Sequence, residues 1–181
     1  PNYGYETVGA VAIEKRDAAG RPLDAIQARR SCSCGPLQAG EKFPQSTWTR
    51  WSRHFYDAWG RVTKTRAYHR IPKSGEGFLG GHYYESRTAY DDLGRVIRQQ
   101  APGGTLTRIV YDGEGRVASI WVGTNDRHAT PTDPTGGGAP RNNMVVRFSY
   151  EYDNGQPGGN GLLTRRTEHV DADPLNERER Q

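Results

Sequence analysis

A short motif occurs three times in the chain, as FYDAWGRVTKT at residues 55–65, AYDDLGRVIRQ at residues 89–99 and VYDGEGRVASI at residues 110–120. Each copy reads Tyr-Asp-x-x-Gly-Arg-Val, and β-branched and aromatic residues flank it, which is typical of strands. Asp is favoured at the first position of a type I turn, and Gly is favoured where the chain then needs a positive φ. A type I turn followed by a left-handed glycine closes a hairpin loop with a bulge. The motif therefore predicts a β-hairpin.

The spacing of the motif also predicts which residues face each other. If Asp57 and Arg61 close the first loop, the count gives the opposed pairs Tyr56–Val62, Phe55–Thr63 and His54–Lys64. One sheet face then carries Tyr and Val, and the other carries an Asp–Arg pair beside the turn. Such cross-strand pairs contribute about 0.2–1 kcal/mol each. The predicted turn residues are Asp57, Gly60, Asp91, Gly94, Asp112 and Gly115, and the predicted packing pairs are Tyr56 with Val62, Tyr90 with Val96, and Tyr111 with Val117.

Two degenerate copies extend the series. RDAAGRPLDAI keeps Asp17 and Gly20 but has Arg16 where Tyr is expected, and YEYDNGQPGGNGLLTRR follows Asp153 with a longer, glycine-rich turn before Leu162. Five hairpins in series predict an all-β fold, an array of antiparallel hairpins that forms an open, spiralling sheet.

This pattern divides the chain into five segments. Residues 1–46 form an N-terminal segment with one degenerate unit, and residues 47–123 hold the clear hairpins. Residues 124–143 are a Pro- and Gly-rich insertion without periodicity, hence a loop. Residues 144–170 form a degenerate hairpin, and residues 171–181 are a polar C-terminal tail.

Composition limits the function classes. Only 33% of the residues are hydrophobic, the mean hydropathy is -0.90, and the formal charge is +4. The Lys and Arg residues are dispersed in runs no longer than a pair, whereas a nucleic-acid footprint is a clustered basic face, so we expect no nucleic-acid partner. No apolar run approaches the roughly 18 residues of a membrane span. The chain starts at Pro1, which suggests a removed leader or a piece of a longer protein.

The chemistry-bearing residues do not form a known catalytic or metal pattern. Cys32 and Cys34 are too close in sequence to bridge without strain, and no paired His completes a zinc set; they are either loop thiols or partners in an intermolecular or long-range bond. No nucleophile elbow, phosphate loop or His-Glu metal motif is present. We therefore expect no enzyme activity, no cofactor and no metal.

At the level of the motif, the chain resembles the YD-repeat, or RHS-repeat, family, because YDAWGRV, YDDLGRV and YDGEGRV match the repeat at every fixed position. The resemblance implies hairpins that coil into a long sheet and wrap into a hollow shell, as in bacterial toxin-complex components, or that serve adhesion at the cell surface, as in teneurins. Some bacterial members of the family are linked to carbohydrate binding. The chain departs from the family in two ways, because five units are too few to close a shell and because DPTGG at residues 133–137 lacks the leucine of the self-cleaving core motif. We interpret DPTGG as a turn.

Two functions follow as expectations. The first is a non-enzymatic structural protein, extracellular or at the cell surface, that joins copies of itself or the rest of a longer repeat chain through strand edges into a filament, tube or shell, because unpaired edges recruit other strands. The alternative is a carbohydrate- or receptor-binding adhesion module. Its contact surface would include the aromatic residues Trp59 and Trp121, since an exposed aromatic on a loop tip marks a contact.

Overall fold

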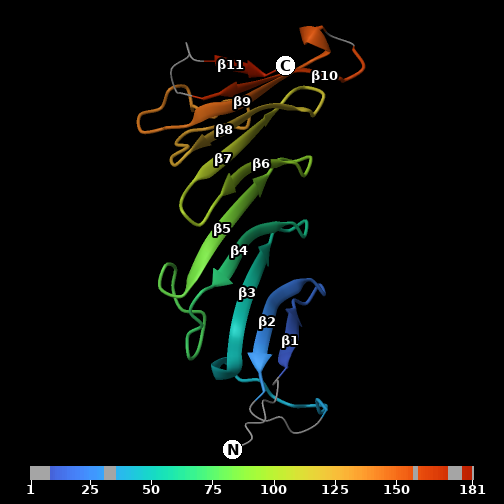
Figure 1. Cartoon of the computed structure of the whole chain (residues 1–181), viewed down its shortest axis with the longest axis vertical. Helices are drawn as coiled ribbons and strands as arrows, with labels where there is room; N and C mark the ends of the chain where they lie inside the picture. Colours follow the sequence, from blue (N-terminus) through green and yellow to red (C-terminus); the bar gives the residue numbers. More distant parts are fainter. Residues whose placement is uncertain (1–8, 31–35, 157–158, 171–176, 181) are drawn as a thin grey trace, which may run out of the picture. The chain divides into compact units, whose positions relative to one another are not determined.

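The computed structural model of the chain describes residues 9–30, 36–156, 159–170 and 177–180. Eleven antiparallel strands form a sheet in which each strand lies beside its neighbours in the sequence, so β1 and β11 are the two outer strands (Figure 1). Apart from the single-turn 3₁₀ segments η1 (Gln45–Thr47) and η2 (Asp153–Gly155), the described residues contain no helix, and neither segment could cross a bilayer. The predicted all-β array of antiparallel hairpins is confirmed. Cys32, Cys34 and most of the C-terminal tail lie outside the described residues.

The strands form hairpins whose loops alternate between two kinds. The strands are β1 (Ala10–Arg16), β2 (Pro22–Arg29), β3 (Trp48–Tyr56), β4 (Val62–Tyr68), β5 (Tyr83–Tyr90), β6 (Val96–Gln100), β7 (Leu106–Tyr111), β8 (Val117–Gly123), β9 (Val145–Tyr152), β10 (Leu163–His169) and β11 (Glu177–Arg180). The Asp-x-x-Gly loops join β1 to β2, β3 to β4, β5 to β6 and β7 to β8, and the longer Asp153 loop joins β9 to β10. The other connections lie at the opposite strand ends, because neighbouring strands are antiparallel.

One of these other connections repeats the turn geometry without the motif. Between β6 and β7, the Ala101 N–H donates to the Thr105 carbonyl (2.8 Å) and the Gly104 N–H donates to the Ala101 carbonyl (2.9 Å). Gly104 has a φ of 88°. The backbone of this loop is therefore the same as in the motif loops, although alanine replaces the aspartate.

The chain divides into two units, residues 1–87 and residues 88–181, and β5 runs across their boundary. In the first unit, one sheet face carries a row of aromatic rings that crosses the strands. Trp51 stacks on Tyr68 with ring centroids 3.7 Å apart, and Trp48 and Tyr83 extend the row on either side. Trp51 and Ile26 are buried in this row, which makes it the apolar core of the unit.

A row of ion pairs lies beside the aromatic row on the same face. Asp24 is buried and accepts two hydrogen bonds from Arg53, at 2.6 and 2.8 Å. Arg53 is the cross-strand partner of Arg66, and Glu76, from the loop between β4 and β5, pairs with both arginines. Arg66 also pairs with Glu85 at 2.9 Å. A loop carboxylate thus separates two opposed guanidinium groups.

The second unit contains a similar arrangement. Arg98 of β6 faces Arg108 of β7, and Asp126, from the loop between β8 and β9, lies 2.6 Å from the first and 3.0 Å from the second. Arg108 is buried, together with the apolar side chains of Leu106 and Met144. Asp126 of the 124–143 loop therefore folds back against this part of the sheet.

The register beside the first motif loop differs from the prediction. Tyr56 faces Val62, as predicted, but a β-bulge between Phe55 and Tyr56 shifts the strands by one residue. The pairs Phe55–Thr63 and His54–Lys64 are therefore wrong, and the structure pairs Phe55 with Lys64 and His54 with Thr65. The bulge adds one residue, Thr63, to the outgoing strand, and the same shift occurs beside the Asp17 and Asp112 loops.

Candidate assembly interface

The three clear motif copies form loops with the same backbone geometry. In the first, the Asp57 N–H donates to the Arg61 carbonyl (3.0 Å), and the Gly60 N–H donates to the Asp57 carbonyl (3.1 Å). Gly60 has a φ of 82°, a conformation that glycine adopts without steric cost. The loops at Asp91 and Asp112 repeat both hydrogen bonds, and Gly94 and Gly115 have a φ of 83°.

The aspartate side chain holds each loop closed. Asp57 Oδ1 accepts hydrogen bonds from the backbone N–H groups of Trp59 and Arg61, both at 2.9 Å, and Oδ2 accepts one from Arg61 Nε at 2.7 Å. Desolvation opposes ionisation, but the hydrogen bonds from Arg61 and Trp59 outweigh it and hold the pKa of Asp57 below its ordinary value. The pKa values of Asp91 and Asp112 are lowered in the same way. These aspartates are therefore turn residues that stay ionised.

The degenerate copies keep this chemistry with different residues. At Asp17 the same three hydrogen bonds form to Ala19 and Arg21. In the long loop, the Asp153 N–H donates to the Leu162 carbonyl (2.9 Å), and the Asp153 carboxylate accepts from the N–H groups of Gly161 and Leu162. Leu162 therefore occupies the position that arginine holds in the other copies.

The motif Tyr and Val residues are placed at the strand ends beside the loops. Tyr56 pairs with Val62 and Tyr111 pairs with Val117 in the ladders. Tyr90 ends β5 and Val96 begins β6, on either side of the Asp91 loop. Tyr56 and Tyr111 also make contacts outside their own hairpins.

The motif tyrosine joins its hairpin to the preceding one. The Tyr111 hydroxyl donates to the Val96 carbonyl at 2.9 Å, and the guanidinium of Arg95 lies over the Tyr111 ring, 4.4 Å from its centroid. The same pair of contacts joins Tyr56 to Pro22 and Arg21 (2.5 and 4.6 Å), and Tyr152 to Val117 and Arg116 (3.1 and 4.4 Å). We call this pair of contacts the tyrosine clasp.

The clasp was not predicted from the sequence, because its partners are brought together by the register between neighbouring hairpins. Extending the ladder between β6 and β7 places Tyr111 opposite Arg95, and extending the ladder between β8 and β9 places Tyr152 opposite Arg116. A cation over an aromatic face contributes about 0.5–1 kcal/mol at an exposed site. Arg21, Arg95 and Arg116 thus each have two partners, the aspartate of their own loop and the tyrosine of the next hairpin.

The two aromatic residues expected to mark a contact surface lie in different environments. Trp59 is at the tip of the Asp57 loop, 77% exposed, with the Arg61 guanidinium 4.8 Å from its ring centroid. Trp121 is half-buried in β8, and its Nε1 donates to Ser119 Oγ at 2.8 Å. Trp59 is therefore an exposed loop-tip residue of the first unit, whereas Trp121 is a half-buried strand residue of the second.

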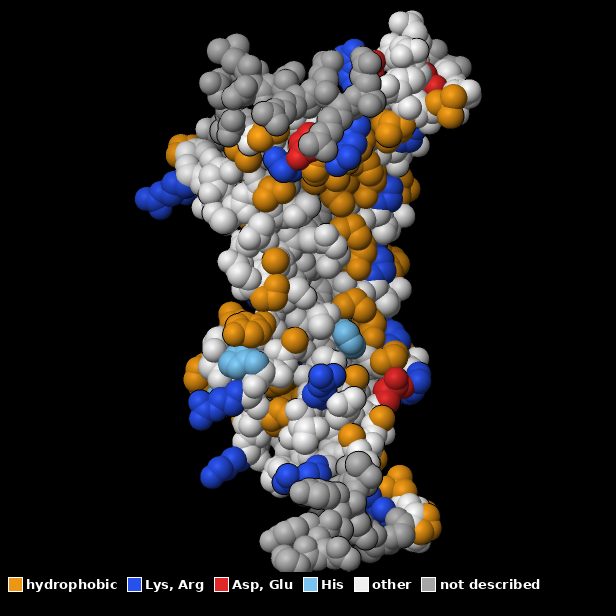
Figure 2. Space-filling model, in the orientation of Figure 1, with side chains coloured by type: hydrophobic (Ala, Val, Ile, Leu, Met, Phe, Trp, Pro, Cys, Tyr) orange, Lys and Arg blue, Asp and Glu red, His pale blue; other side chains and the backbone are white. Residues whose placement is uncertain are grey.

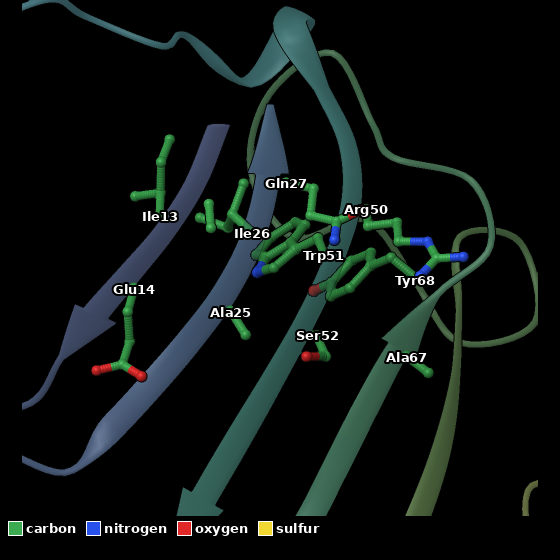
Figure 3. A pocket seen from close by; sticks show the side chains of 11 residues that line it. Ile13, Glu14, Ala25, Ile26, Gln27, Arg50, Trp51, Ser52, Ala67 and Tyr68 are labelled. Atoms are coloured by element: carbon green, nitrogen blue, oxygen red, sulfur yellow. The ribbon is translucent and has the colours of Figure 1, made fainter. Parts of the chain in front are cut away.

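A shallow groove of about 500 Å³ crosses β1 to β4 in the first unit (Figure 3). Its floor includes Ala25, Ser52 and Ala67, which are successive cross-strand partners, and Gln27 and Arg50 lie beside this row. Because these floor residues are small, the sheet surface is hollowed at this point, and polar side chains form the rim. Neither predicted contact tryptophan lines it.

Charged side chains are distributed along the chain. On the face drawn in Figure 2, Lys and Arg side chains stand singly or in small groups among hydrophobic ones. Within the described residues, no group of three or more His, Cys, Asp or Glu side chains is arranged to hold a metal ion. The contact that repeats between hairpins in the described residues is the tyrosine clasp.

Comparisons with known proteins give only structural likeness. No protein-family model matches the sequence, and no curated protein matches it. Among solved structures, the complex of TcdB2 and TccC3 with Cdc42 has a TM-score of 0.43 at 14% identity, over 94% of this chain and 9% of that chain. The Tc holotoxin pore of Photorhabdus luminescens has a TM-score of 0.42 at 12% identity, over 89% of this chain and 8% of that chain. The chain thus spans less than a tenth of either structure, and a likeness of this degree does not establish a family for it.

Proposed function

We propose that the chain is a non-enzymatic structural module, secreted or at the cell surface, that contributes hairpins to a larger β-assembly. It would join other strands through its sheet edges, either as copies in a filament or tube or as part of the wall of a longer repeat chain. The observation that carries this proposal is the tyrosine clasp, which repeats between hairpins with closely similar geometry. A contact that recurs along one direction is suited to extending an array.

Other strands would join this sheet at its two outer strands, β1 and β11. β11 is the last strand in the described sheet and has only β10 beside it. β1 has only β2 beside it in the described sheet. Unpaired backbone groups at such edges pair with other strands unless they are blocked.

The proposal is tested by sedimentation velocity of the purified chain over a concentration series, combined with amide hydrogen exchange at both edges. If copies assemble, we expect association with increasing concentration and protection of amides in β1 or β11. If the chain is instead part of the wall of a longer repeat chain, we expect a monomer whose β11 edge becomes protected when further strand residues are added to the C-terminus.

A matched pair of variants locates the contact. Ala12→Lys places a charge on the exposed side of the β1 edge strand, whereas Ala18→Lys places the same charge on an exposed turn. Only the first should weaken an association through β1, because edge charges oppose strand pairing. A monomer at every concentration whose edges also stay unprotected after extension would contradict the structural role.

A second candidate is a glycan- or receptor-binding module, favoured by the exposed Trp59 at a loop tip. Binding on a glycan array that is lost in Trp59→Ala and kept in Leu93→Ala would support it, since Leu93 is an equally exposed apolar tip residue. Absence of binding to every glycan would remove the glycan version.

A further inference from the structure

The connection between β4 and β5, residues 69–82, carries two neighbouring apolar side chains that face solvent. Phe78 and Leu79 are 64% and 60% exposed, and the Phe78 ring packs edge-on against the His82 ring at a centroid distance of 4.7 Å. In the first unit this connection lies at the strand ends opposite to the Asp57 loop (Figure 1). Exposed apolar groups that lie together mark contacts with proteins or with membranes.

Hydrogen bonds fix the backbone at the tip of this connection. The His82 N–H donates to the Phe78 carbonyl at 3.0 Å, and the Phe78 N–H donates to His82 Nδ1 at 3.3 Å. The Gly80 N–H donates to the Tyr83 carbonyl at 3.0 Å. The two apolar side chains are therefore presented by an ordered loop, so that binding through them costs less conformational entropy than binding through a flexible one.

The charges of the connection are divided between the sheet and the solvent. Its one carboxylate, Glu76, pairs with two arginines of the sheet. Its two basic residues, Arg70 and Lys73, are exposed and have no ion-pair partner among the described residues. Arg70 lies beside the tip, because its N–H donates to the His82 carbonyl at 3.1 Å. The solvent side of the connection is therefore both apolar and positively charged.

We propose that this connection binds the surface of an anionic lipid bilayer through Phe78, Leu79, Arg70 and Lys73. The apolar pair enters the boundary between headgroups and acyl chains, where the removal of apolar surface from water is favourable. The two cations lie among the anionic headgroups. The inference goes beyond the proposed structural role and does not depend on it, because the connection is separate from the outer strands β1 and β11.

A lipid surface fits these residues better than a protein pocket does. A bilayer accepts an apolar pair at a loop tip without a cavity of matching shape. The carboxylate of Glu76 is engaged by the sheet, so the exposed cations of the connection determine how it meets anionic headgroups. The contact is weak and reversible, since even a single myristoyl chain gives only marginal membrane binding.

Flotation of the purified full chain with an excess of lipid vesicles tests the proposal. One set of vesicles is phosphatidylcholine alone, and in the other about one lipid in three is phosphatidylserine. Each basic side chain near an anionic surface contributes about five-fold to binding, so we expect the partition coefficient to be at least about ten-fold higher with phosphatidylserine. Amide exchange at residues 78–82 should slow on the anionic vesicles.

Two matched pairs of variants locate the contact. Leu79→Ser should lower the partition coefficient by about three- to ten-fold, whereas Leu93→Ser, at a turn residue that is 78% exposed, should leave it unchanged. Arg70→Gln should lower it by about five-fold, whereas Arg50→Gln, at an exposed residue of β3, should change it little. All four side chains are exposed, so the variants retain the fold.

The absence of binding to both kinds of vesicle, or equal losses in the two members of a pair, would overturn the proposal. If vesicles do not bind and Leu79→Ser instead weakens the association of the chain with itself, the connection is a protein contact and the lipid proposal is wrong. Either failure can be told apart from a failure of the structural role, which is measured by sedimentation and hydrogen exchange without lipid.

Discussion

Asp126 is a position at which a single substitution should destabilise the second unit. Its carboxylate lies between Arg98 and Arg108, which face each other across β6 and β7. In the described part of the chain it is the one carboxylate placed against these two arginines. Asp126→Asn keeps the size of the side chain but leaves two opposed cations, one of them buried.

The expected loss of stability follows from the burial of the three groups. Breaking a buried ion pair by removing one partner costs about 3–5 kcal/mol. The side chains of Asp126 and Arg98 are 16% and 26% exposed, and that of Arg108 is 8% exposed, so water screens part of the interaction. We therefore expect Asp126→Asn to lower the free energy of unfolding by about 2–4 kcal/mol.

Urea unfolding followed by circular dichroism, with hydrogen exchange over Arg98 and Arg108, measures this loss. Glu76→Gln is the matched control, because Glu76 also bridges two opposed arginines. These arginines keep Asp24 and Glu85 as partners, so the control should cost less than about 1 kcal/mol. Equal effects of the two substitutions, or a loss below about 0.5 kcal/mol for Asp126→Asn, would refute the reasoning.

Three further predictions concern the clasp and the loops. Tyr111→Phe removes the hydrogen bond to the Val96 carbonyl and should cost about 0.5–1.5 kcal/mol in urea unfolding. Gly115→Ala should cost about 1–3 kcal/mol, because its φ is 83° and a Cβ would lie 3.0 Å from Arg95 Nη1; Gly113→Ala, which has open space around it, should be nearly neutral. The lowered pKa values of the turn aspartates stabilise the fold above the unfolded-state pKa of about 3.9. Stability in a pH titration should therefore fall as the pH drops through and below about 4, and a loss that begins near neutral pH would contradict this cause.

Local chemistry was sufficient to predict the hairpins. Asp57 and Gly60 lie within one loop, and the hydrogen bonds that close it join residues at most four positions apart. Such contacts depend on residues within the loop, so the spacing of a few residues is enough to predict them. The predicted register held for Tyr56 and Val62 and failed at the next pair, at Phe55, because Thr63 is an extra residue on β4 only.

Contacts between hairpins required the tertiary structure. Tyr152 and Arg116 are far apart in the sequence and meet because β8 and β9 pair in one register. The 124–143 segment shows the same limit, since its composition predicts a loop but not that Asp126 folds back onto Arg98 and Arg108.

By itself, the sequence determined where the chain reverses and which residues turn it, because those conformations depend on glycine backbone freedom and on aspartate side chains that bond to their own loop. Only the tertiary structure decided which arginine meets which tyrosine and which carboxylate lies between opposed arginines. The physical reason is that these pairings depend on strand register and on the path of long loops, which is decided by the free energy of the whole packed sheet.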